Sequence, residues 1–450
     1  MTIHASTVGA LPKPVAVAAI PGLSRLTLSN GLTVFLLSRA RAPLVSLRLQ
    51  FSRGSAVVPA GKSGLADLTA QLLRRGTERH SAEAIDEMLE GAGTDLGVSV
   101  SDDSTCFTLT AEPPSAPRLF GLLGELLRLA SFPKQEVTAL RERTCDQLKA
   151  SLDDAEWVAT RAAYRTVFAG HPYGVPSEGW SSELAGLGRK DVRAFGSGFF
   201  GRGACLVLAG AVTEPLDVLL RPFLRLPAGP EPANKLSVPP ALRGRHVVIV
   251  DKPDATQAQI RLVGTGLRRG AADLIPAILG NGVLGDGFSS RLVNEVRVNR
   301  GLTYGISSRF GALEVGGLFA VRSFTRLDKV SELVQVVIDQ MSLLRDEGPS
   351  EEELSRVRTY LGGAYRIGTE TPEQVGAHTA DAFRYGLGDD WLARYPRLLG
   401  ETPREAVGAA LRAYLPVEKL RVVAVGPAVK LERQLKRFGS VEVIALRDMA

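Results

Sequence analysis

Residues 64–77, GLADLTAQLLRRGT, have the spacing of a zinc-binding helix but not its ligands. In an H-x-x-E-H helix, two histidines four residues apart bind zinc from one face, and the glutamate beside the second histidine activates a water molecule. The corresponding positions here are Asp67, Ala70 and Gln71. Because glutamine is a weak ligand and alanine cannot accept a proton, a nitrogen-rich tetrahedral zinc site cannot form on this helix. We therefore expect this chain to bind no metal and no other cofactor.

The same segment is predicted to be a packed amphipathic helix over residues 64–75, closed by Gly76. The apolar stripe that faces the core consists of Leu65, Leu68 and Leu72. The other, solvated face carries Asp67, Ala70, Gln71 and Arg74.

A second group of residues that could do chemistry lies in SSRLVNEVRVNRGLTYGISS, residues 289–308. The two serines that open it are good N-cap residues, and Gly301 is a natural residue to end the helix that follows them. A strand is predicted to begin near Leu302 and to reverse the chain. Arg297 in the last helical turn and Tyr304 in the strand, seven residues apart, can then face the same mouth.

Both of these residues also have a structural interpretation. Tyr304 shares its strand parity with Leu302 and Ile306, so it could be a core tyrosine. Arg297 could pair with Glu295 or interact with the carbonyl groups at the end of the helix. The residues by themselves leave these alternatives open.

The composition is that of an ordinary globular protein with more than one domain. The chain has 450 residues, of which 45% are hydrophobic and 23% are charged. The net charge is +6, but the basic residues are scattered among acidic ones, so we expect no nucleic-acid partner. The three cysteines, Cys106, Cys145 and Cys205, are too far apart for a CxxC pair or a zinc site and are predicted to be buried thiols.

The N-terminal segment is predicted to carry neither an export signal nor a membrane span. It has no basic leader, and its apolar run VAVAAI is too short and too closely bounded by prolines for either role. We expect a cytoplasmic location by default, with the periplasm as the alternative.

The sequence matches itself at a long and slowly growing offset. Ala66-Asp67-Leu68 corresponds to Ala272-Asp273-Leu274 at an offset of 206, and LGVS at 96 corresponds to YGIS at 304 at an offset of 208. FPKQEV at 132 corresponds to GPSEEE at 348, and LVLAG at 206 to VVAVG at 422, both at an offset of 216. Loop insertions make such an offset grow in one direction, whereas chance matches scatter, so we infer a tandem duplication.

Each half combines strand-like alternation with long helical patterns. The predicted fold class is α+β, with two homologous lobes, each an antiparallel-rich sheet with helices on one face. The predicted parts are an N-terminal extension (1–19), an N-terminal lobe (20–227), a Pro- and Gly-rich linker (228–245) and a C-terminal lobe (246–450).

Two further features are predicted to be structural. The glycine-dense stretch GNGVLGDGFSSRL lacks the GK[ST] ending and the preceding strand of a phosphate-binding loop. His171, in the turn HPYG, lies beside a proline and is expected to pack rather than to bind a ligand.

Several of these segments together resemble one family of enzymes. The frame RGSAVVPAGKSGLADLTAQLLRRGT resembles the start of the pitrilysin, insulysin and mitochondrial processing peptidase superfamily of zinc peptidases. The likeness continues through HPYG at 171, DKPDATQAQI at 251 and, above all, the segment 289–308. It covers roughly residues 20–445, and the two-lobed duplication of that family agrees with the repeat found independently above.

The resemblance implies that this chain lacks the zinc site of active relatives. Those relatives carry a GxxHxxEHxxFxGT-type segment where this chain has Asp67, Ala70 and Gln71. Their third metal ligand, a glutamate, would fall near Gln147, which also departs from the pattern, although Glu142 is close by in the sequence.

The resemblance also implies that a substrate-binding pair is present. Relatives have an arginine and a tyrosine with the R-x6-Y spacing of Arg297 and Tyr304, and there the pair reaches across to the zinc site of the opposite lobe or subunit. By that resemblance, Tyr304 and Arg297 hold the substrate carbonyl group and stabilise the oxyanion that forms when water attacks it.

The resulting hypothesis is a non-catalytic subunit of a heterodimeric zinc metallopeptidase, inactive on its own. Its partner is expected to be a homologous H-x-x-E-H subunit that holds the zinc, and the two subunits are expected to close around a peptide like a clamshell. One alternative is a degenerate peptidase fold that serves as a scaffold or peptide-binding subunit. Another is a self-sufficient peptidase whose unusual metal site uses Asp67, Gln71 and a residue distant in the sequence.

Overall fold

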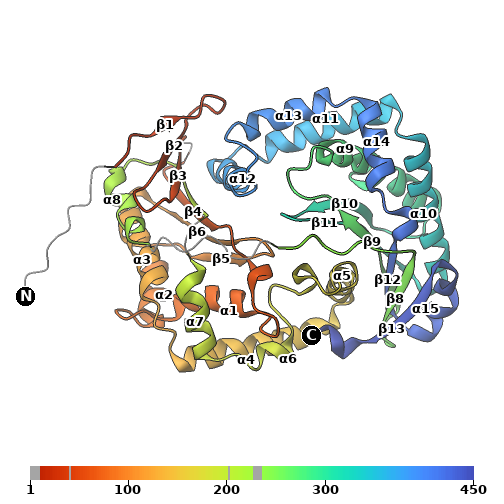
Figure 1. Ribbon diagram of the computed structural model, residues 1–450, viewed down its shortest axis with the longest axis horizontal. Helices are drawn as coiled ribbons and strands as arrows, with labels where there is room; N and C mark the ends of the chain where they lie inside the picture. Colours follow the sequence, from red (N-terminus) through yellow and green to blue (C-terminus); the bar gives the residue numbers. More distant parts are fainter. Residues whose placement is uncertain (1–10, 40–41, 201–202, 227–235) are drawn as a thin grey trace, which may run out of the picture.

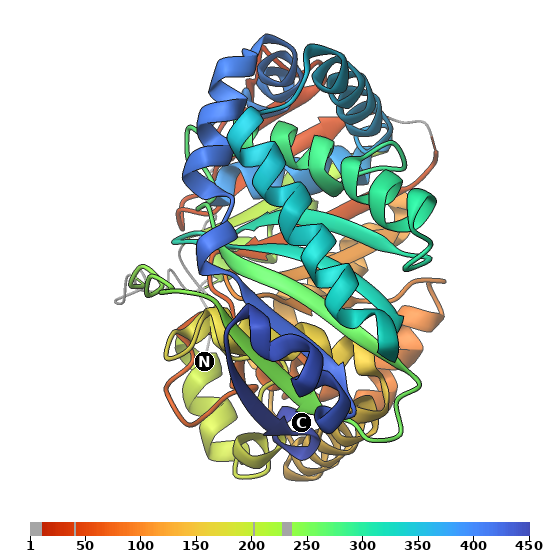
Figure 2. The same cartoon turned by 90° about the vertical axis from the view of Figure 1, so that its right-hand side faces the viewer.

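The chain folds into two lobes that lie side by side, each built on one β-sheet (Figure 1). The computed structural model describes residues 11–39, 42–200, 203–226 and 236–450. Turned by a quarter, the C-terminal lobe shows a layer of helices that covers the outer face of its sheet (Figure 2). The predicted α+β class with two lobes is therefore confirmed.

Among the described residues, the N-terminal sheet has seven strands and the C-terminal sheet has six. The strands of the first sheet are β1 (Val15–Ala16), β2 (Leu23–Thr27), β3 (Thr33–Ser38), β4 (Val45–Phe51), β5 (Gly97–Val100), β6 (Thr105–Ala111) and β7 (Ala204–Gly210). The strands of the second sheet are β8 (His246–Asp251), β9 (Gln257–Gly266), β10 (Ile306–Ala312), β11 (Gly317–Arg326), β12 (Arg421–Gly426) and β13 (Ser440–Ala445).

The helices follow the same division. The N-terminal half contains α1 (Leu65–Leu72), α2 (Ala82–Glu90), α3 (Ala116–Leu129), α4 (Lys134–Ala150), α5 (Ala155–Val167), α6 (Ser181–Leu184), α7 (Arg189–Phe199) and α8 (Leu216–Leu220). The C-terminal half contains α9 (Leu274–Gly285), α10 (Val330–Glu347), α11 (Glu351–Ile367), α12 (Pro372–Arg384), α13 (Trp391–Glu401), α14 (Arg404–Tyr414) and α15 (Ala428–Leu435), together with a π-helix (Val293–Asn299).

Five strands of each sheet share one topology. The order β3-β7-β4-β6-β5 in the first sheet corresponds to β8-β12-β9-β11-β10 in the second. In each case the first pair is parallel and the next three pairs are antiparallel. The matching sequence segments fall on corresponding elements, for example LVLAG on β7 and VVAVG on β12. The duplication is an inference from these sequence offsets, and the shared strand order agrees with it.

The two halves exchange one helix each. Helix α5 belongs to the N-terminal half but packs on the C-terminal sheet, against β8, β9 and β12. Its Val158 and Ala162 are completely buried there, in one cluster with Val248 and Val423 of that sheet. Helix α12 belongs to the C-terminal half and packs on the N-terminal sheet, against β3, β4 and β7. Figure 1 shows each of these helices lying against the sheet of the opposite lobe.

This exchange corrects the prediction that helices cover one face of each sheet. The outer face of the N-terminal sheet packs on helices that include α1 and α3, and the outer face of the C-terminal sheet packs on helices that include α9, α10, α14 and α15. The inner face of each sheet is then partly covered by the exchanged helix. Periodicity cannot reveal this arrangement, because an apolar stripe shows that a helix is buried but not which sheet buries it.

A buried polar cluster joins the lobes where the turn between β5 and β6 meets the turn between β10 and β11. Asp103, in the first turn, accepts hydrogen bonds from the Tyr173 hydroxyl at 2.6 Å and from the Glu314 backbone N–H at 3.0 Å. Its carboxylate also lies 3.0 Å from the Arg384 guanidinium at the end of α12, and the two side chains are 1% and 4% exposed. A single carboxylate therefore links the N-terminal sheet to both a turn and a helix of the other half.

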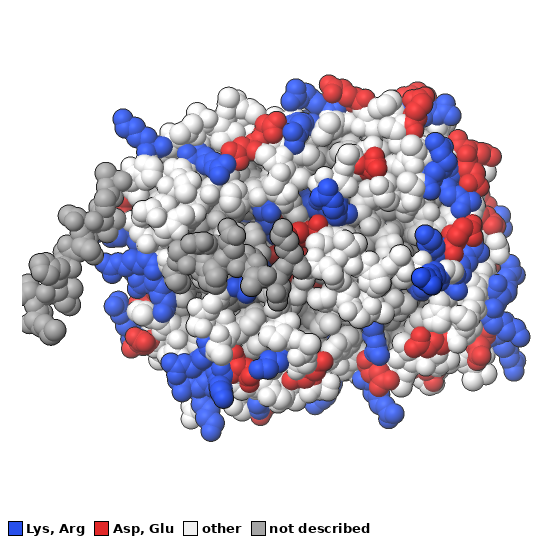
Figure 3. Space-filling view, in the orientation of Figure 1, with Lys and Arg blue, Asp and Glu red and all other residues white. Residues whose placement is uncertain are grey.

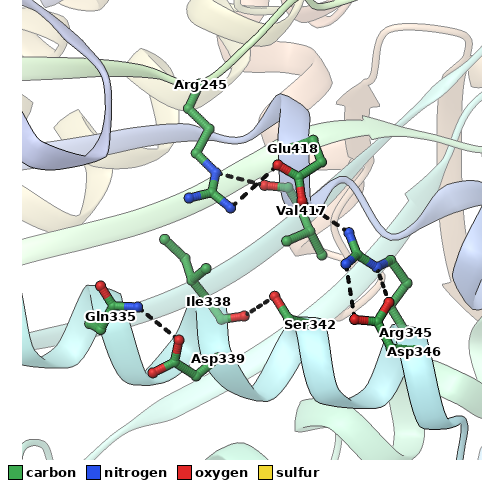
Figure 4. A network of polar contacts seen from close by, with 9 residues as sticks. All are labelled: Arg245, Gln335, Ile338, Asp339, Ser342, Arg345, Asp346, Val417 and Glu418. Carbon is green, nitrogen blue, oxygen red and sulfur yellow. Dashed lines mark hydrogen bonds and ion pairs between the residues drawn. The ribbon is translucent and has the colours of Figure 1, made fainter.

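A second polar network fixes the outer helix α10 to the loop that precedes β12 (Figure 4). Glu418 in that loop lies 3.2 Å from Arg345 of α10 and 3.7 Å from Arg245. Arg345 also contacts its neighbour Asp346 at 2.7 Å, and Arg245 donates to the Val417 carbonyl at 2.9 Å. Because the carboxylates of Glu418 and Asp346 are exposed, the network orients the loop more than it stabilises the fold.

The predicted parts of the chain can be compared with the structure only in part. Residues 1–10 of the predicted extension and 228–235 of the predicted linker lie outside the described residues. The rest of the extension is not separate from the lobe, because β1 pairs with β2 in antiparallel fashion. Residues 236–245 contain no helix or strand.

We expect Asp103→Ala to lower the free energy of unfolding by about 3–5 kcal/mol, because it leaves the buried Arg384 charge without its carboxylate. Urea denaturation of the full chain measures this change. The double variant Asp103→Leu/Arg384→Met removes both charges and should cost less than the single one. A change below about 1 kcal/mol for Asp103→Ala would show that this cluster does not hold the lobes together.

Candidate functional site

Helix α1 lies close to its predicted position but buries the residue that would have to be the general base. It spans Leu65–Leu72, and a 3₁₀ turn over Leu73–Arg75 extends it to Gly76. Ala70 is completely buried in the core, whereas Asp67 and Gln71 are half-buried. The prediction of a solvated face is therefore wrong at Ala70.

The side chains that remain on this helix are poor metal ligands. Burial, followed by repulsion from Glu178, raises the pKa of Asp67 from its ordinary value of 3.8 to about 6, although a hydrogen bond from Gln71 lowers it. The Gln71 amide also donates weakly to the Val98 carbonyl at 3.5 Å. A single half-buried carboxyl group with a raised pKa and an amide that is already engaged do not make the set of three or four nitrogen, sulfur or oxygen ligands that zinc requires.

The position aligned with the third ligand adds nothing to a metal site. Gln147 lies on the exposed side of α4, and the nearby Glu142 is 64% exposed and pairs with Arg141 at 3.3 Å. Across the described residues, no group of three or more histidine, cysteine, aspartate or glutamate side chains is arranged to hold a metal ion.

Arg297 and Tyr304 line one pocket of about 690 Å³ in the C-terminal lobe. The pocket lies between the end of α9, the π-helix, the loop before β10 and the helix α11. The lining residues that matter below are Phe288, Val293, Arg297, Tyr304, Ser307 and Tyr360. The structure thus brings the two predicted residues to a common mouth, as the sequence suggested.

The local backbone differs from the prediction in two ways. The helix that carries Arg297 is a π-helix over Val293–Asn299 rather than a regular α-helix, and it ends before Gly301, which has a φ of +59°. π-helical turns are rare and frequently occur at functional sites. Tyr304 lies in the loop before β10, which begins at Ile306, so the prediction that it belongs to a strand is wrong.

Hydrogen bonds hold the backbone on both sides of Tyr304. The Leu302 carbonyl accepts from the Thr325 hydroxyl at 2.7 Å. The Gly305 carbonyl accepts from the Ser323 hydroxyl at 3.0 Å and from the Thr303 hydroxyl at 3.1 Å. Because Ser323 and Thr325 belong to β11, the loop is fixed to the sheet while the tyrosine ring projects from it.

The structure decides between the alternatives that the sequence left open. Tyr304 is 85% exposed, so it is not a core tyrosine. Glu295 is already engaged, since it binds Arg300 at 2.7 Å and Asn299 at 2.9 Å. Arg297 is exposed and forms no ion pair within the described part of the chain; its guanidinium lies 5.8 Å from the centre of the Phe288 ring.

A half-buried ion pair anchors the wall of the pocket. Arg291, just before the π-helix, donates to both carboxylate oxygens of Glu353 at 2.7 and 2.8 Å. Burial would raise the pKa of Glu353, but hydrogen bonds from Arg291 and Ser350 lower it to about 2. The carboxylate therefore stays charged and joins the start of the π-helix to the start of α11.

Two aromatic residues of this site were not predicted. Phe288 is 84% exposed at the rim of the pocket, and Tyr360 of α11 is 52% exposed. An aromatic residue inside the polar, glycine-rich run GDGFSS is a signal that could have identified Phe288. Tyr360 comes from a helix more than fifty residues later in the chain and gives no such signal.

The glycines that precede Phe288 in the sequence allow helix α9 to pack closely against its neighbours. A Cβ at Gly282 would lie 2.4 Å from a methyl group of Val357, and one at Gly285 would lie 2.5 Å from the Ser308 hydroxyl. Both glycines belong to α9, which can thus pack tightly against α11 and β10. This packing gives the glycine-dense stretch a structural role.

The other candidate residues are structural. All three cysteines are free and buried, as predicted, and burial raises the pKa of each thiol. His171 is also buried; its Nδ1 accepts from the Tyr173 backbone N–H at 3.1 Å, and its Nε2 lies 2.8 Å from the Ser237 carbonyl. These contacts occupy both ring nitrogens.

The surface adds two observations about partners. On the face that Figure 3 shows, basic and acidic side chains are intermixed rather than gathered into a large patch of one sign. No helix in the described part of the chain is long and apolar enough to cross a bilayer.

Comparison with known proteins identifies the class of this fold. The family model described as Insulinase (Peptidase family M16) matches residues 33–179, and the model described as Peptidase M16 inactive domain matches residues 189–361. The second match covers the segment with Arg297 and Tyr304.

Relatives and solved structures agree with this assignment. An uncharacterized zinc protease, YmxG, of Bacillus subtilis is 20% identical over 78% of this chain and 85% of its own length. One of Rickettsia bellii is 22% identical over 80% of this chain and 87% of its own length. The crystal structure of a peptidase M16 inactive domain from Pseudomonas fluorescens has a TM-score of 0.82 at 24% identity, covering 90% of this chain and 98% of that one. A protease from Helicobacter pylori has a TM-score of 0.82 at 18% identity, covering 93% of this chain and 100% of that one.

These matches define a two-lobed, peptidase-like α+β protein. Because both family models describe one family and together span most of the sequence, the chain belongs to peptidase family M16. Within that family its α1 carries Asp67, Ala70 and Gln71, which do not fit a zinc site.

The raised pKa of Asp67 predicts an unusual dependence of stability on pH. The native state binds the proton of the Asp67 carboxyl group more tightly than the unfolded state does. The contribution of this bound proton to the free energy of unfolding is therefore fully present below about pH 4 and is lost as the pH rises through about 6. We expect Asp67→Asn to raise the free energy of unfolding at pH 8 by up to about 3 kcal/mol and to change it little at pH 4. Urea denaturation at both pH values measures the difference.

The exposed Asp328 offers a control for this experiment, since Asp328→Asn removes the same charge without relieving burial. Equal effects of Asp67→Asn at pH 4 and pH 8 would contradict the assignment.

Proposed function

We propose that this chain is the non-catalytic subunit of a two-subunit zinc peptidase. In this proposal a homologous subunit with an H-x-x-E-H helix supplies the zinc, the activated water and the general base. This chain supplies Arg297, Tyr304 and part of the wall that encloses the peptide.

The observation that carries the proposal is a contrast between two sites in one chain. The positions that would bind zinc hold a buried alanine, a carboxyl group with a raised pKa and an amide. By contrast, the arginine and the tyrosine of the substrate-binding pair are both present, and both side chains are exposed at one pocket. Hydrogen bonds from β11 fix the backbone on both sides of the tyrosine. A purely structural role would not explain a tyrosine that is 85% exposed at the entrance of a pocket.

The chemistry of the pair suits peptide hydrolysis. When water attacks a peptide bond, negative charge develops on the carbonyl oxygen, and fixed donors stabilise it. The Tyr304 hydroxyl can donate one hydrogen bond to that oxygen, and the Arg297 guanidinium can donate others with its positive charge. In this role both residues act as hydrogen-bond donors, and neither has to give up a proton.

The pocket around the pair is suited to holding a peptide chain. Its rim offers the exposed rings of Phe288 and Tyr360, which can cover apolar parts of a substrate. Strands β5 and β10 lie at the edges of their sheets, and an edge strand can bind an extended peptide through its backbone. These features support binding of a peptide without requiring a metal in this chain.

We expect Arg297→Ala and Tyr304→Phe each to lower kcat/KM of the reconstituted pair by about 100- to 1000-fold, because each removes one donor to the oxyanion. The measurement is hydrolysis of a quenched fluorescent peptide by this chain mixed with the H-x-x-E-H subunit. Arg433→Ala, which removes an exposed arginine of α15, is the matched control. Gel filtration should show that the variants still bind the partner.

A double variant Arg297→Ala/Tyr304→Phe with unchanged cleavage would favour the scaffold hypothesis instead. In that case the chain would support the partner without touching the substrate.

We also expect the isolated chain to retain well below one equivalent of zinc after incubation with zinc and gel filtration. The reason is that Ala70 is buried and Gln71 offers an amide rather than an imidazole. Elemental analysis of the protein peak measures the metal content. One equivalent of bound zinc would support the alternative hypothesis of a self-sufficient peptidase.

A further inference from the structure

Part of the inner face of the C-terminal sheet is not covered by the exchanged helix. Helix α5 packs against β8, β12 and β9, while β11 and β10 continue beyond it to the edge of the sheet. Along β10, the buried residues Ile306, Ser308 and Phe310 alternate with the exposed residues Ser307 and Arg309. The edge of the sheet therefore presents a polar, basic side to its surroundings.

Strand register shows which side this is. Arg261 of β9 pairs with Arg322 of β11, which in turn pairs with Ser307 of β10. Directly paired residues point to the same side of a sheet, and Arg261 contacts Glu156 of α5 at 3.5 Å. Arg322 and Ser307 therefore lie on the α5 side, and so does Arg309, which is two residues beyond Ser307.

This side of the sheet faces the N-terminal lobe. Burial, followed by the charge of Asp102, raises the pKa of Tyr164 on α5, while the charges of Arg309 and Arg322 lower it. One tyrosine thus lies within electrostatic reach of a carboxylate of the first lobe and of both arginines of the second. Both arginines are exposed on this side of the sheet.

The positive charge of this row is only partly balanced by described residues, because Glu156 contacts Arg261 alone. Like charges that are directly paired across strands destabilise a sheet, yet Arg261 and Arg322 are paired in this way. Arg261 is 2% exposed, and its Nε has no hydrogen-bond partner. Arg309 and Arg322 are exposed and form no ion pair with any described carboxylate; Asp286 is within electrostatic reach of Arg309 but is not paired with it.

The arginines also adjoin the site proposed above. Ser307 lines the same pocket as Arg297 and Tyr304, and Arg309 follows it by two residues, about 7 Å along the strand. A peptide held at the pocket in an extended conformation would pass its next side chains over Arg309 and Arg322.

We propose that Arg309 and Arg322 form a subsite for carboxylate side chains, so that the site prefers peptides with aspartate or glutamate next to the cleaved bond. The inference rests on the proposed function, because it takes the peptide to lie at the Arg297 and Tyr304 pocket. Guanidinium groups bind carboxylates through paired hydrogen bonds, and the edge strand leaves room for an extended chain.

The test compares two short fluorescein-labelled peptides that differ only in charge. One carries two glutamates two residues apart, and its twin carries glutamines at the same positions. Fluorescence anisotropy with the full chain alone should show about three- to tenfold tighter binding of the glutamate peptide at low salt, and the preference should shrink at high salt. Equal affinities, or no saturable binding of either peptide, would overturn the proposal.

Matched variants assign the effect to this face. Arg309→Gln/Arg322→Gln should abolish the preference for the glutamate peptide. Arg404→Gln/Arg433→Gln removes the same charge from exposed positions on α14 and α15, and it should leave the preference intact. If the control lowered the preference equally, net charge rather than a subsite would explain it.

A further variant distinguishes this inference from the proposed function. Arg297→Ala should lower partner-dependent cleavage by about 100- to 1000-fold while leaving the preference for glutamate in the binding assay. Cleavage by the reconstituted pair without any preference for acidic peptides would overturn the subsite and leave the proposed function standing.

Discussion

The structure depends on the exchange of two helices between its halves. Each sheet buries its outer face with helices of its own lobe, but its inner face is partly covered by a helix from the other lobe, α5 on one side and α12 on the other. Neither lobe can therefore complete its core alone, and the relative position of the lobes is fixed by apolar packing. The buried Asp103 cluster adds a polar lock at the point where the two sheets' turns meet.

This constraint also shapes the site. Because α5 covers only part of the C-terminal sheet, Arg322 of β11 and the residues Ser307 and Arg309 of β10 stay exposed on the side on which α5 packs. The same two strands fix the loop of Tyr304 and carry Arg309 and Arg322. Arg309, Arg322 and the loop of Tyr304 thus lie on or are fixed to the edge of the sheet, where donors need little reorganisation to meet a substrate.

The sequence predicted those features that depend on local pattern. The offset between the halves predicted two lobes, since corresponding strands keep the same apolar spacing, as in β7 and β12. The residue types at Asp67 and Gln71 led to the expectation that zinc does not fit this helix, which stays a prediction. Features that depend on distant packing were missed: the exchanged helices, the complete burial of Ala70 and the part that Tyr360 plays in the pocket. The π-helix was missed as well, because one extra residue in a turn hardly changes an apolar pattern over so short a segment.

The most direct test of the split site is a titration. Hydrolysis of a quenched fluorescent peptide is measured with this chain alone, with the H-x-x-E-H subunit alone, and with the two mixed at increasing ratios. The account predicts that activity appears only in the mixture, saturates near equal amounts and disappears when a chelator removes the zinc. An H-x-x-E-H subunit that reaches the same rate without this chain would contradict it.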